Sequence, residues 1–344
     1  MSKGTLDHTL HEIPFDSEFS PGARNAVRTC LRIQPSEKVT IITDRDSREI
    51  AASIAHEVEA VGAPYTAWVL EDLAERPLRA MPGEILQDME SSRVSIYAVH
   101  AQEGELRTRM QMTDVVNRRR IRHAHMVNIN RQIMLEGMRA DFNRVDEISR
   151  KVLEVASAAR TIRAKTAAGT DITAELNPKY RWLKTSGIIS EEKWGNLPGG
   201  EVFTTPGNVN GTYVVDGVLG DYFSARYGHL AATPLTIRIE ENCIEEISCS
   251  DARIEDDFWA YTHTDENSDR VGEFAIGTNI EVHDIIGQIL QDEKYPGVHV
   301  AFGNPYGEHT GADWFSSTHI DVVGRNFDIW ADHRQIMRAG EFML

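Results

Sequence analysis

Two ionisable residues, His319 and Asp321, stand two positions apart in the segment SSTHIDVVG, residues 316–324. The segment otherwise reads as a half-buried strand. Successive side chains of a strand point to opposite faces, so these two point to the same side, with about 6.5 Å between their Cα atoms. An isolated H-x-D pair is most often a salt-bridged pair on the solvated face of an edge strand. A metal-binding role for the pair therefore requires further ligands elsewhere in the chain.

Three other segments offer donors of a compatible kind. Glu201 follows Pro-Gly-Gly and opens an apolar run, Glu273 stands among small and apolar residues in VGEFAIGTN, and His299 lies in the strand-like run VHVAFG. Taken singly, each has an ordinary structural explanation as a solvated glutamate or a hydrogen-bonded histidine. Together with the H-x-D pair they form a set of oxygen and nitrogen donors without sulfur. Such a set suits zinc, cobalt, manganese or iron.

Charge balance predicts how many ions the five residues would hold if they converge. The set contains three carboxylates and two imidazoles. Two divalent ions with a bridging hydroxide would neutralise the three negative charges. A single divalent ion would leave a buried negative excess, which is costly. The composition of the set therefore favours two ions.

The motifs GNLPGGEVFTTP, VGEFAIGTN, DEKYPGVHVAFGNPY and STHIDVVG, in this order, resemble the M29 family of metallo-aminopeptidases, the aminopeptidase T and aminopeptidase S group. The resemblance covers roughly residues 155–335. It implies a homodimer and a centre of two divalent ions, zinc, cobalt or manganese. The ligand positions that it implies are Glu201, Glu273, His299, Tyr306, His319 and Asp321.

The resemblance also implies a catalytic glutamate shortly before the His299 position. The match here is Glu293 in QDEKYPG, one residue further from the histidine than the family spacing, and a solvated turn glutamate is the alternative. As a general base, Glu293 would take a proton from a metal-bound water and deliver it to the leaving amine. Tyr306 is either a weak ligand or a hydrogen-bond donor to the developing oxyanion. The predicted activity is removal of N-terminal residues from small peptides.

A second enzyme class stays open. The same superfamily includes ring-cleaving dioxygenases of dihydroxypyridines, which hold one iron(II) with two histidines and a carboxylate. Resemblance to those enzymes implies a histidine at the Glu273 position and no ligands at the positions of Glu201 and His299, whereas this chain has all three ligands. The two-metal aminopeptidase is therefore the first prediction. The mononuclear dioxygenase and a two-metal hydrolase of another small amide are the alternatives.

Hydrophobic periodicity predicts the elements that position these residues. Over residues 1–155, β-branched runs such as VTIITD alternate with amphipathic segments such as DSREIAASIAHEVEAVGA, which predicts a doubly wound, Rossmann-like α/β domain. No G-x-G-x-x-G follows its first strand, so a dinucleotide site is not predicted. Over residues 156–344, TIRAKTAAGTDITAEL and LTIRIEENCIEEISC read as hairpins. The second half is therefore predicted to be a strand-rich α+β domain that carries the metal site.

Composition restricts the partners and the compartment. The 344 residues carry a formal charge of −17, which argues against binding to nucleic acid or to an anionic membrane. Three cysteines without a C-x-x-C motif argue against a disulfide framework. The N-terminal sequence lacks a signal-like apolar stretch, and no long apolar run follows it. These features predict a cytoplasmic protein. The M29 resemblance implies a small peptide or amide as its substrate.

Overall fold

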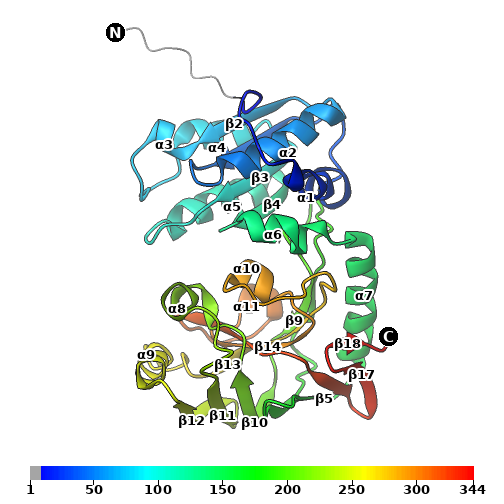
Figure 1. Cartoon of the computed structure of the whole chain (residues 1–344), viewed down its shortest axis with the longest axis vertical. Helices are drawn as coiled ribbons and strands as arrows, with labels where there is room; N and C mark the ends of the chain where they lie inside the picture. Colours follow the sequence, from blue (N-terminus) through cyan, green and yellow to red (C-terminus); the bar gives the residue numbers. More distant parts are fainter. Residues whose placement is uncertain (1–8) are drawn as a thin grey trace. The chain divides into compact units, whose positions relative to one another are not determined.

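The computed structural model describes residues 9–344 (Figure 1). The chain forms two compact units. The first, called the N-terminal unit, contains the chain up to Asn143 and the segment Gly187–Gly199; the second, called the C-terminal unit, contains Arg144–Ser186 and Gly200–Leu344. The chain therefore passes between the units three times. None of the helices within residues 9–344 is both long and apolar enough to cross a membrane.

A parallel five-stranded sheet organises the N-terminal unit, in the order β2-β1-β3-β4-β8. Its strands are β1 (Val39–Thr43), β2 (Tyr65–Val69), β3 (Val94–Val99), β4 (Arg122–Val127) and β8 (Gly195–Asn196). Its helices are η1 (Ser17–Phe19), α1 (Ser20–Arg24), η2 (Asn25–Cys30), α2 (Arg48–Val61), α3 (Leu70–Leu73), α4 (Gly83–Met89), α5 (Leu106–Arg119), α6 (Arg131–Leu135) and η3 (Gly137–Arg139).

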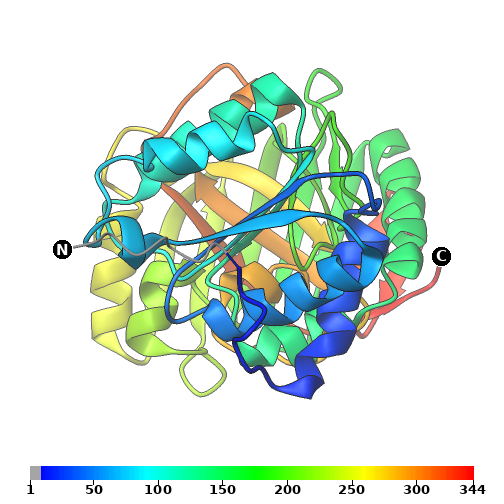
Figure 2. The ribbon, with the colours of Figure 1, turned by 90° about the horizontal axis from the view of Figure 1, so that it is seen from above.

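Helices lie on either side of this sheet, as Figure 2 shows. Ile42 of β1 packs in one cluster with Met89 of α4 and Met112 of α5. Helix α2 contacts β1, β2 and β3 and buries Ile54 and Val58. A doubly wound sheet requires this arrangement, because parallel strands are buried on both faces. The predicted α/β architecture of the first half is confirmed.

Two histidines of β4 are buried in this unit. The hydroxyl of Ser95 lies 2.8 Å from Nδ1 of His123, and Nε2 of His123 lies 3.2 Å from Nδ1 of His125. The His125 ring stacks on Tyr97, with 5.2 Å between the ring centroids. Burial lowers the pKa of His123 to about 3 and lowers the pKa of His125 well below its ordinary value. The folded protein therefore keeps both rings neutral at neutral and mildly acidic pH.

Mild acid should destabilise the protein through these histidines. In the unfolded chain a histidine binds a proton near pH 6.5, whereas folded His123 binds one only near pH 3, so stability falls as the pH drops through this window. For His123 alone the loss at pH 5 is about 2 kcal/mol relative to neutral pH. Urea unfolding at pH 7, 6 and 5 should show a smaller loss for His123→Gln than for the wild type. His229→Gln, at an exposed position, should behave as the wild type. Equal losses in all three proteins would contradict the assignment.

Helix α7 (Phe142–Ala158) spans the division between the units. The sequence places the domain boundary near residue 155, whereas the compact units divide between Asn143 and Arg144. The reason is that Ile148, Val152 and Ala156 pack into the core of the C-terminal unit. The sequence also does not predict the return of the chain to the first unit, where β8 pairs with the edge of β4.

Two antiparallel sheets form the C-terminal unit. The large sheet has the order β12-β11-β10-β6-β5-β16-β17-β18, and the small sheet has the order β15-β14-β13-β9-β7. The strands are β5 (Thr161–Lys165), β6 (Asp171–Glu175), β7 (Leu183–Thr185), β9 (Glu201–Thr204), β10 (Asn208–Val215), β11 (Leu235–Glu240), β12 (Cys243–Cys249), β13 (Val271–Gly277), β14 (Gly297–Gly303), β15 (His319–Val323), β16 (Asp328–Ala331), β17 (Arg334–Arg338) and β18 (Glu341–Phe342). The helices after α7 are α8 (Gly220–Tyr227), α9 (Ala252–Tyr261), α10 (Ile289–Asp292) and α11 (Gly307–Thr310).

Both predicted hairpins of the C-terminal unit are present. Strand β5 pairs with β6, and β11 pairs with β12 through a turn at Glu241 and Asn242. These two turn residues have φ values of 49° and 72°. Positive φ at both central residues is the conformation that lets a two-residue turn follow the twist of its strands.

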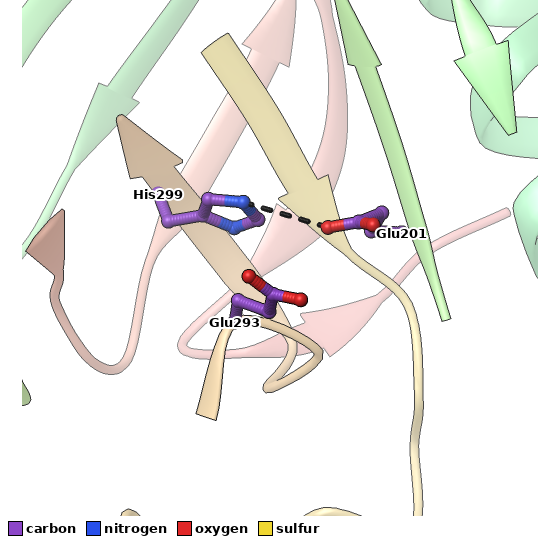
Figure 3. A group of neighbouring side chains, drawn as sticks. All are labelled: Glu201, Glu293 and His299. Atoms are coloured by element: carbon purple, nitrogen blue, oxygen red, sulfur yellow. Dashed lines mark ion pairs between the residues drawn. The ribbon is translucent and has the colours of Figure 1, made fainter. Parts of the chain in front are cut away.

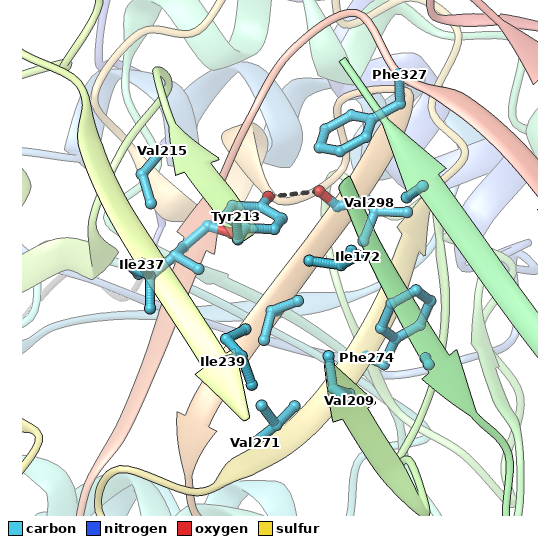
Figure 4. Packing of buried hydrophobic residues seen from close by; sticks show 14 of the residues in the cluster. Ile172, Val209, Tyr213, Val215, Ile237, Ile239, Val271, Phe274, Val298 and Phe327 are labelled. Atoms are coloured by element: carbon cyan, nitrogen blue, oxygen red, sulfur yellow. Dashed lines mark hydrogen bonds between the residues drawn. The ribbon is translucent and has the colours of Figure 1, made fainter. Parts of the chain in front are cut away.

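The core of the C-terminal unit lies between its two sheets (Figure 4). Ile172 and Ile237 of the large sheet share this core with Phe274 and Val298 of the small sheet. Tyr213 of β10 links the sheets, because its hydroxyl donates to the Val298 carbonyl at 2.7 Å. One face of the small sheet therefore packs against the large sheet. Every second residue along its strands is turned away from the core.

Candidate metal centre

The proposed ligands lie on the face of the small sheet that is turned away from the core. On β13, Phe274 and Ile276 enter the core, so Glu273 points the other way; on β14, Val298 and Val300 do so, and His299 points the other way. The same alternation places Glu201 of β9 and the His319 and Asp321 pair of β15 on that face. The period of two therefore explains how residues from four strands reach one side of one sheet.

Strand register brings these side chains together. Glu273 and Asp321 each lie directly across from Ala301 of β14, on either side of it. Ala275 is the partner of His299 on the neighbouring strand β13. The short alanine side chains at these positions leave space above the sheet that the carboxylates and the imidazole can occupy.

A bulge in β13 adjusts the direction of Glu273. The pairing between β13 and β14 shifts register between Val271 and Glu273. Gly272 lies at this shift, and a Cβ atom there would stand 2.3 Å from the Gly303 carbonyl oxygen. Only glycine permits this close approach of the two backbones. Bulges commonly redirect side chains at functional sites, and this one precedes a proposed ligand.

Three carboxylates surround the ring of His299. Its Nε2 atom lies 3.6 Å from Glu201 Oε2, 3.5 Å from Glu273 Oε1 and 4.0 Å from Asp321 Oδ1. The imidazole is 2% exposed, and this Nε2 atom has no hydrogen-bond partner within residues 9–344. Ligands of one zinc ion at about 2.1 Å stand roughly 3.4 Å apart. The spacing and the unpartnered nitrogen fit an ion bound between these groups.

His319 lies on the other side of Asp321. Its Nε2 atom is 3.5 Å from Asp321 Oδ2, and its Nδ1 atom is 2.9 Å from the Asn304 carbonyl. A carbonyl only accepts, so Nδ1 donates a proton to Asn304, and Nε2 is the ring nitrogen that is left to face an ion, as in many metal sites. Asp321 thus directs one oxygen toward His299 and the other toward His319. A carboxylate placed in this way has one oxygen on each side with which it could hold an ion.

Tyr306 reaches the cluster through its ring. The ring centroids of Tyr306 and His319 are 4.5 Å apart. Tyr306 has a φ of 49°, and its backbone N–H donates to the Asn304 side chain at 2.9 Å. Within the described chain, its hydroxyl forms no hydrogen bond to the carboxylates of the cluster. The geometry brings Tyr306 beside the other predicted residues.

Glu293 lies in the same cluster, directly after α10 (Figure 3). Glu201, Glu293 and His299 each offer one ligand atom, and these atoms all lie within 4.8 Å of one another. The preceding Asp292 accepts backbone hydrogen bonds from Ile286, Gly287 and Gln288 and so holds the turn that carries Glu293. Burial raises the pKa of Glu293 to about 8.

Sequence reasoning missed Lys294, the next residue in the same DEKYPG motif. Its side chain is fully buried, and its Nζ atom lies 2.8 Å from Glu201 Oε1 and contacts Glu293 Oε1. The sequence offers only two indications of a role for Lys294: it is a cationic residue, and it is next to the proposed catalytic residue Glu293. With its four carboxylates ionised, the cluster keeps three excess negative charges beside this single ammonium. Bound cations would compensate such an excess, so the donor set fits metal ions.

Comparison with known proteins identifies the family of the chain. Residues 21–344 match the family model described as "NicX: 2,5-dihydroxypyridine 5,6-dioxygenase". The chain belongs to the NicX family. The family match therefore falls on the class that the sequence analysis ranks second, and the NicX family is a family of enzymes. No protein of curated function matches this NicX family member.

Two solved structures share the fold of this NicX family member. The 2,5-dihydroxypyridine dioxygenase from Pseudomonas putida KT2440 is 17% identical and has a TM-score of 0.69, with 95% of this chain and 98% of that chain covered. Wild-type AmpT from Thermus thermophilus is 16% identical and has a TM-score of 0.71, with 95% and 99% covered. At these identities the likeness shows the fold alone.

Proposed function

We propose that the protein is a two-metal hydrolase that removes N-terminal residues from small peptides. The observation that carries the proposal is Asp321, whose two oxygens face His299 and His319 at 4.0 and 3.5 Å. A carboxylate placed between two imidazoles in this way can hold one ion on each side. Glu201 and Glu273 add the negative charge that a second ion requires.

The chemistry follows from the residues of the cluster. Two divalent ions, when bound, supply an acidified water and polarise the scissile carbonyl. Glu293 takes the proton from this water and passes it to the leaving amine. Tyr306 donates a hydrogen bond to the oxygen that becomes negative in the transition state. The acidic cluster also attracts the positively charged α-amine of a peptide, which accounts for attack at the N-terminal residue.

Ring-cleaving dioxygenation is the second candidate, and two observations favour it. The family model carries that activity in its description. His299, His319 and Asp321 also supply two histidines and one carboxylate, the usual ligand set of a mononuclear iron(II) oxygenase. Against it, such a site has no use for Glu201 and Glu273, which are both buried beside His299. The fold itself does not separate the candidates, because this chain shares it with both the dioxygenase and AmpT.

Metal content should separate the two candidates. We expect about two equivalents of zinc, cobalt or manganese per chain, because two ions with a hydroxide balance the cluster. Elemental analysis of protein purified anaerobically, without chelators or an affinity-tag metal, measures this directly. The same preparation should hydrolyse aminoacyl anilides and dipeptides.

One equivalent of iron, with oxygen uptake in the presence of 2,5-dihydroxypyridine, would instead establish the dioxygenase. Light scattering on the anaerobically purified protein would test the homodimer that the M29 resemblance implies.

A further inference from the structure

Lys294 is a charged group that the proposed reaction does not use. Its side chain has no exposed surface, and its ammonium contacts one oxygen of Glu201 and one of Glu293. Within residues 9–344, these two carboxylates and His299 form one of two groups of side chains with the spacing of a metal site. A protein cation therefore lies within a set of residues that could themselves bind an ion.

The two oxygens of Glu201 have different partners. Oε1 accepts from Lys294 at 2.8 Å and from the Thr185 hydroxyl at 2.7 Å. Oε2 faces the unpartnered Nε2 atom of His299 at 3.6 Å. Glu201 can therefore bind an ion through Oε2 while Oε1 keeps its ion pair with Lys294. Two donors on one oxygen also fix the carboxylate plane, as outer partners of metal ligands commonly do.

Glu293 forms an ion pair with the same ammonium. If it turned to bind an ion, Lys294 would lose one of its two carboxylate partners in a fully buried position, which is energetically costly. The ammonium also repels a second cation placed close to the pair. Lys294 thus opposes metal ligation by Glu293 in two ways.

We propose that Lys294 is the resident cation of the Glu201 and Glu293 pair and that it keeps Glu293 from becoming a metal ligand. Glu293 then stays available for proton transfer, and the ions are held by the remaining carboxylates and imidazoles. Lys294 acts through its neighbours and is a positioning residue. The inference rests on the metal centre of the proposed function.

The sign of a change in metal affinity tests this role. In Lys294→Met the repulsion is lost and Glu293 is free to bind the ion, so we expect zinc affinity to rise about tenfold or more. If Lys294 only supported Glu201, its loss would lower the affinity, typically by about 10- to 100-fold. Competition of the metal-free protein with a chromophoric zinc chelator measures both outcomes. The melting temperature should likewise rise more on zinc addition for the variant than for the wild type.

Three further variants complete the experiment. Lys294→Arg, which keeps the charge, should retain affinity near the wild-type value. In the double variant Lys294→Met with Glu293→Gln, the gain should shrink, because Glu293 can no longer bind the ion. Lys165→Met removes an ion-paired lysine of β5 and should change nothing.

The outcomes separate this inference from the proposed function. Unchanged or weaker zinc binding by Lys294→Met would overturn the role of Lys294 while leaving the metal centre intact. A wild-type protein that binds no metal would overturn the proposed function itself. If Lys294→Met does not fold, Glu293→Gln alone decides: the proposal requires zinc affinity within about threefold of the wild type, and a larger loss would make Glu293 a ligand.

Discussion

Replacement of Asp321 by asparagine should strongly reduce both metal retention and activity. The variant keeps the shape of the side chain but removes the charge and one of the two oxygens that face His299 and His319. An amide offers only one oxygen, so it cannot bridge two ions. We expect turnover to fall by about a thousandfold or more, with metal content reduced to one equivalent or less.

Elemental analysis and steady-state kinetics on the same preparation check this expectation. Asp171→Asn is a matched control, because Asp171 is an aspartate of β6 whose carboxylate pairs with Arg163 and Lys165. This control should retain metal and activity. A variant at Asp321 with full metal content and full turnover would remove the residue from the centre and, with it, the argument for two ions.

Replacement of Glu293 by glutamine should produce a different pattern. The amide keeps the size of the side chain but cannot accept a proton from water. Turnover should fall by about 10²- to 10⁴-fold, the usual contribution of a general base. KM and metal content should stay close to the wild-type values if, as we propose, the carboxylate that contacts Lys294 does not bind an ion.

Single-turnover assays with zinc-loaded protein, together with metal analysis, distinguish the possible roles of Glu293. Glu240→Gln, at an exposed position of β11, is the control and should resemble the wild type. Loss of metal from the Glu293 variant would identify a ligand. Unchanged turnover would identify a bystander.

Much of the candidate site could be predicted because it depends on local patterns. The H-x-D spacing places His319 and Asp321 on one side of β15 through the period of two, and the same rule directs Glu273 and His299. The hairpin of β11 and β12 was predictable for a similar reason, since Glu-Asn lies between two alternating runs. Such features need no knowledge of distant contacts.

Other features depend on pairing between distant segments. Strand β8 has two residues and exists because it adds to the edge of β4, about seventy residues earlier in the chain. The boundary at Asn143 depends on which core receives the apolar face of α7. Lys294 resembles a solvated turn lysine in the sequence. Its burial becomes evident only when Glu201, which lies on the distant strand β9, is seen to pair with its ammonium.

The chain crosses between its two units three times, and these crossings restrict how the units can be exchanged during evolution. A single cut at residue 143 would leave β4 as an open edge, a site of association with other chains, because β8 would depart with the other fragment. The final passage, at Gly199, also ends two residues before Glu201. One recombination event therefore cannot exchange either unit intact. To exchange one unit intact, recombination would have to join the two parent sequences at all three crossings at once. The N-terminal unit and the candidate metal centre are therefore expected to be inherited together.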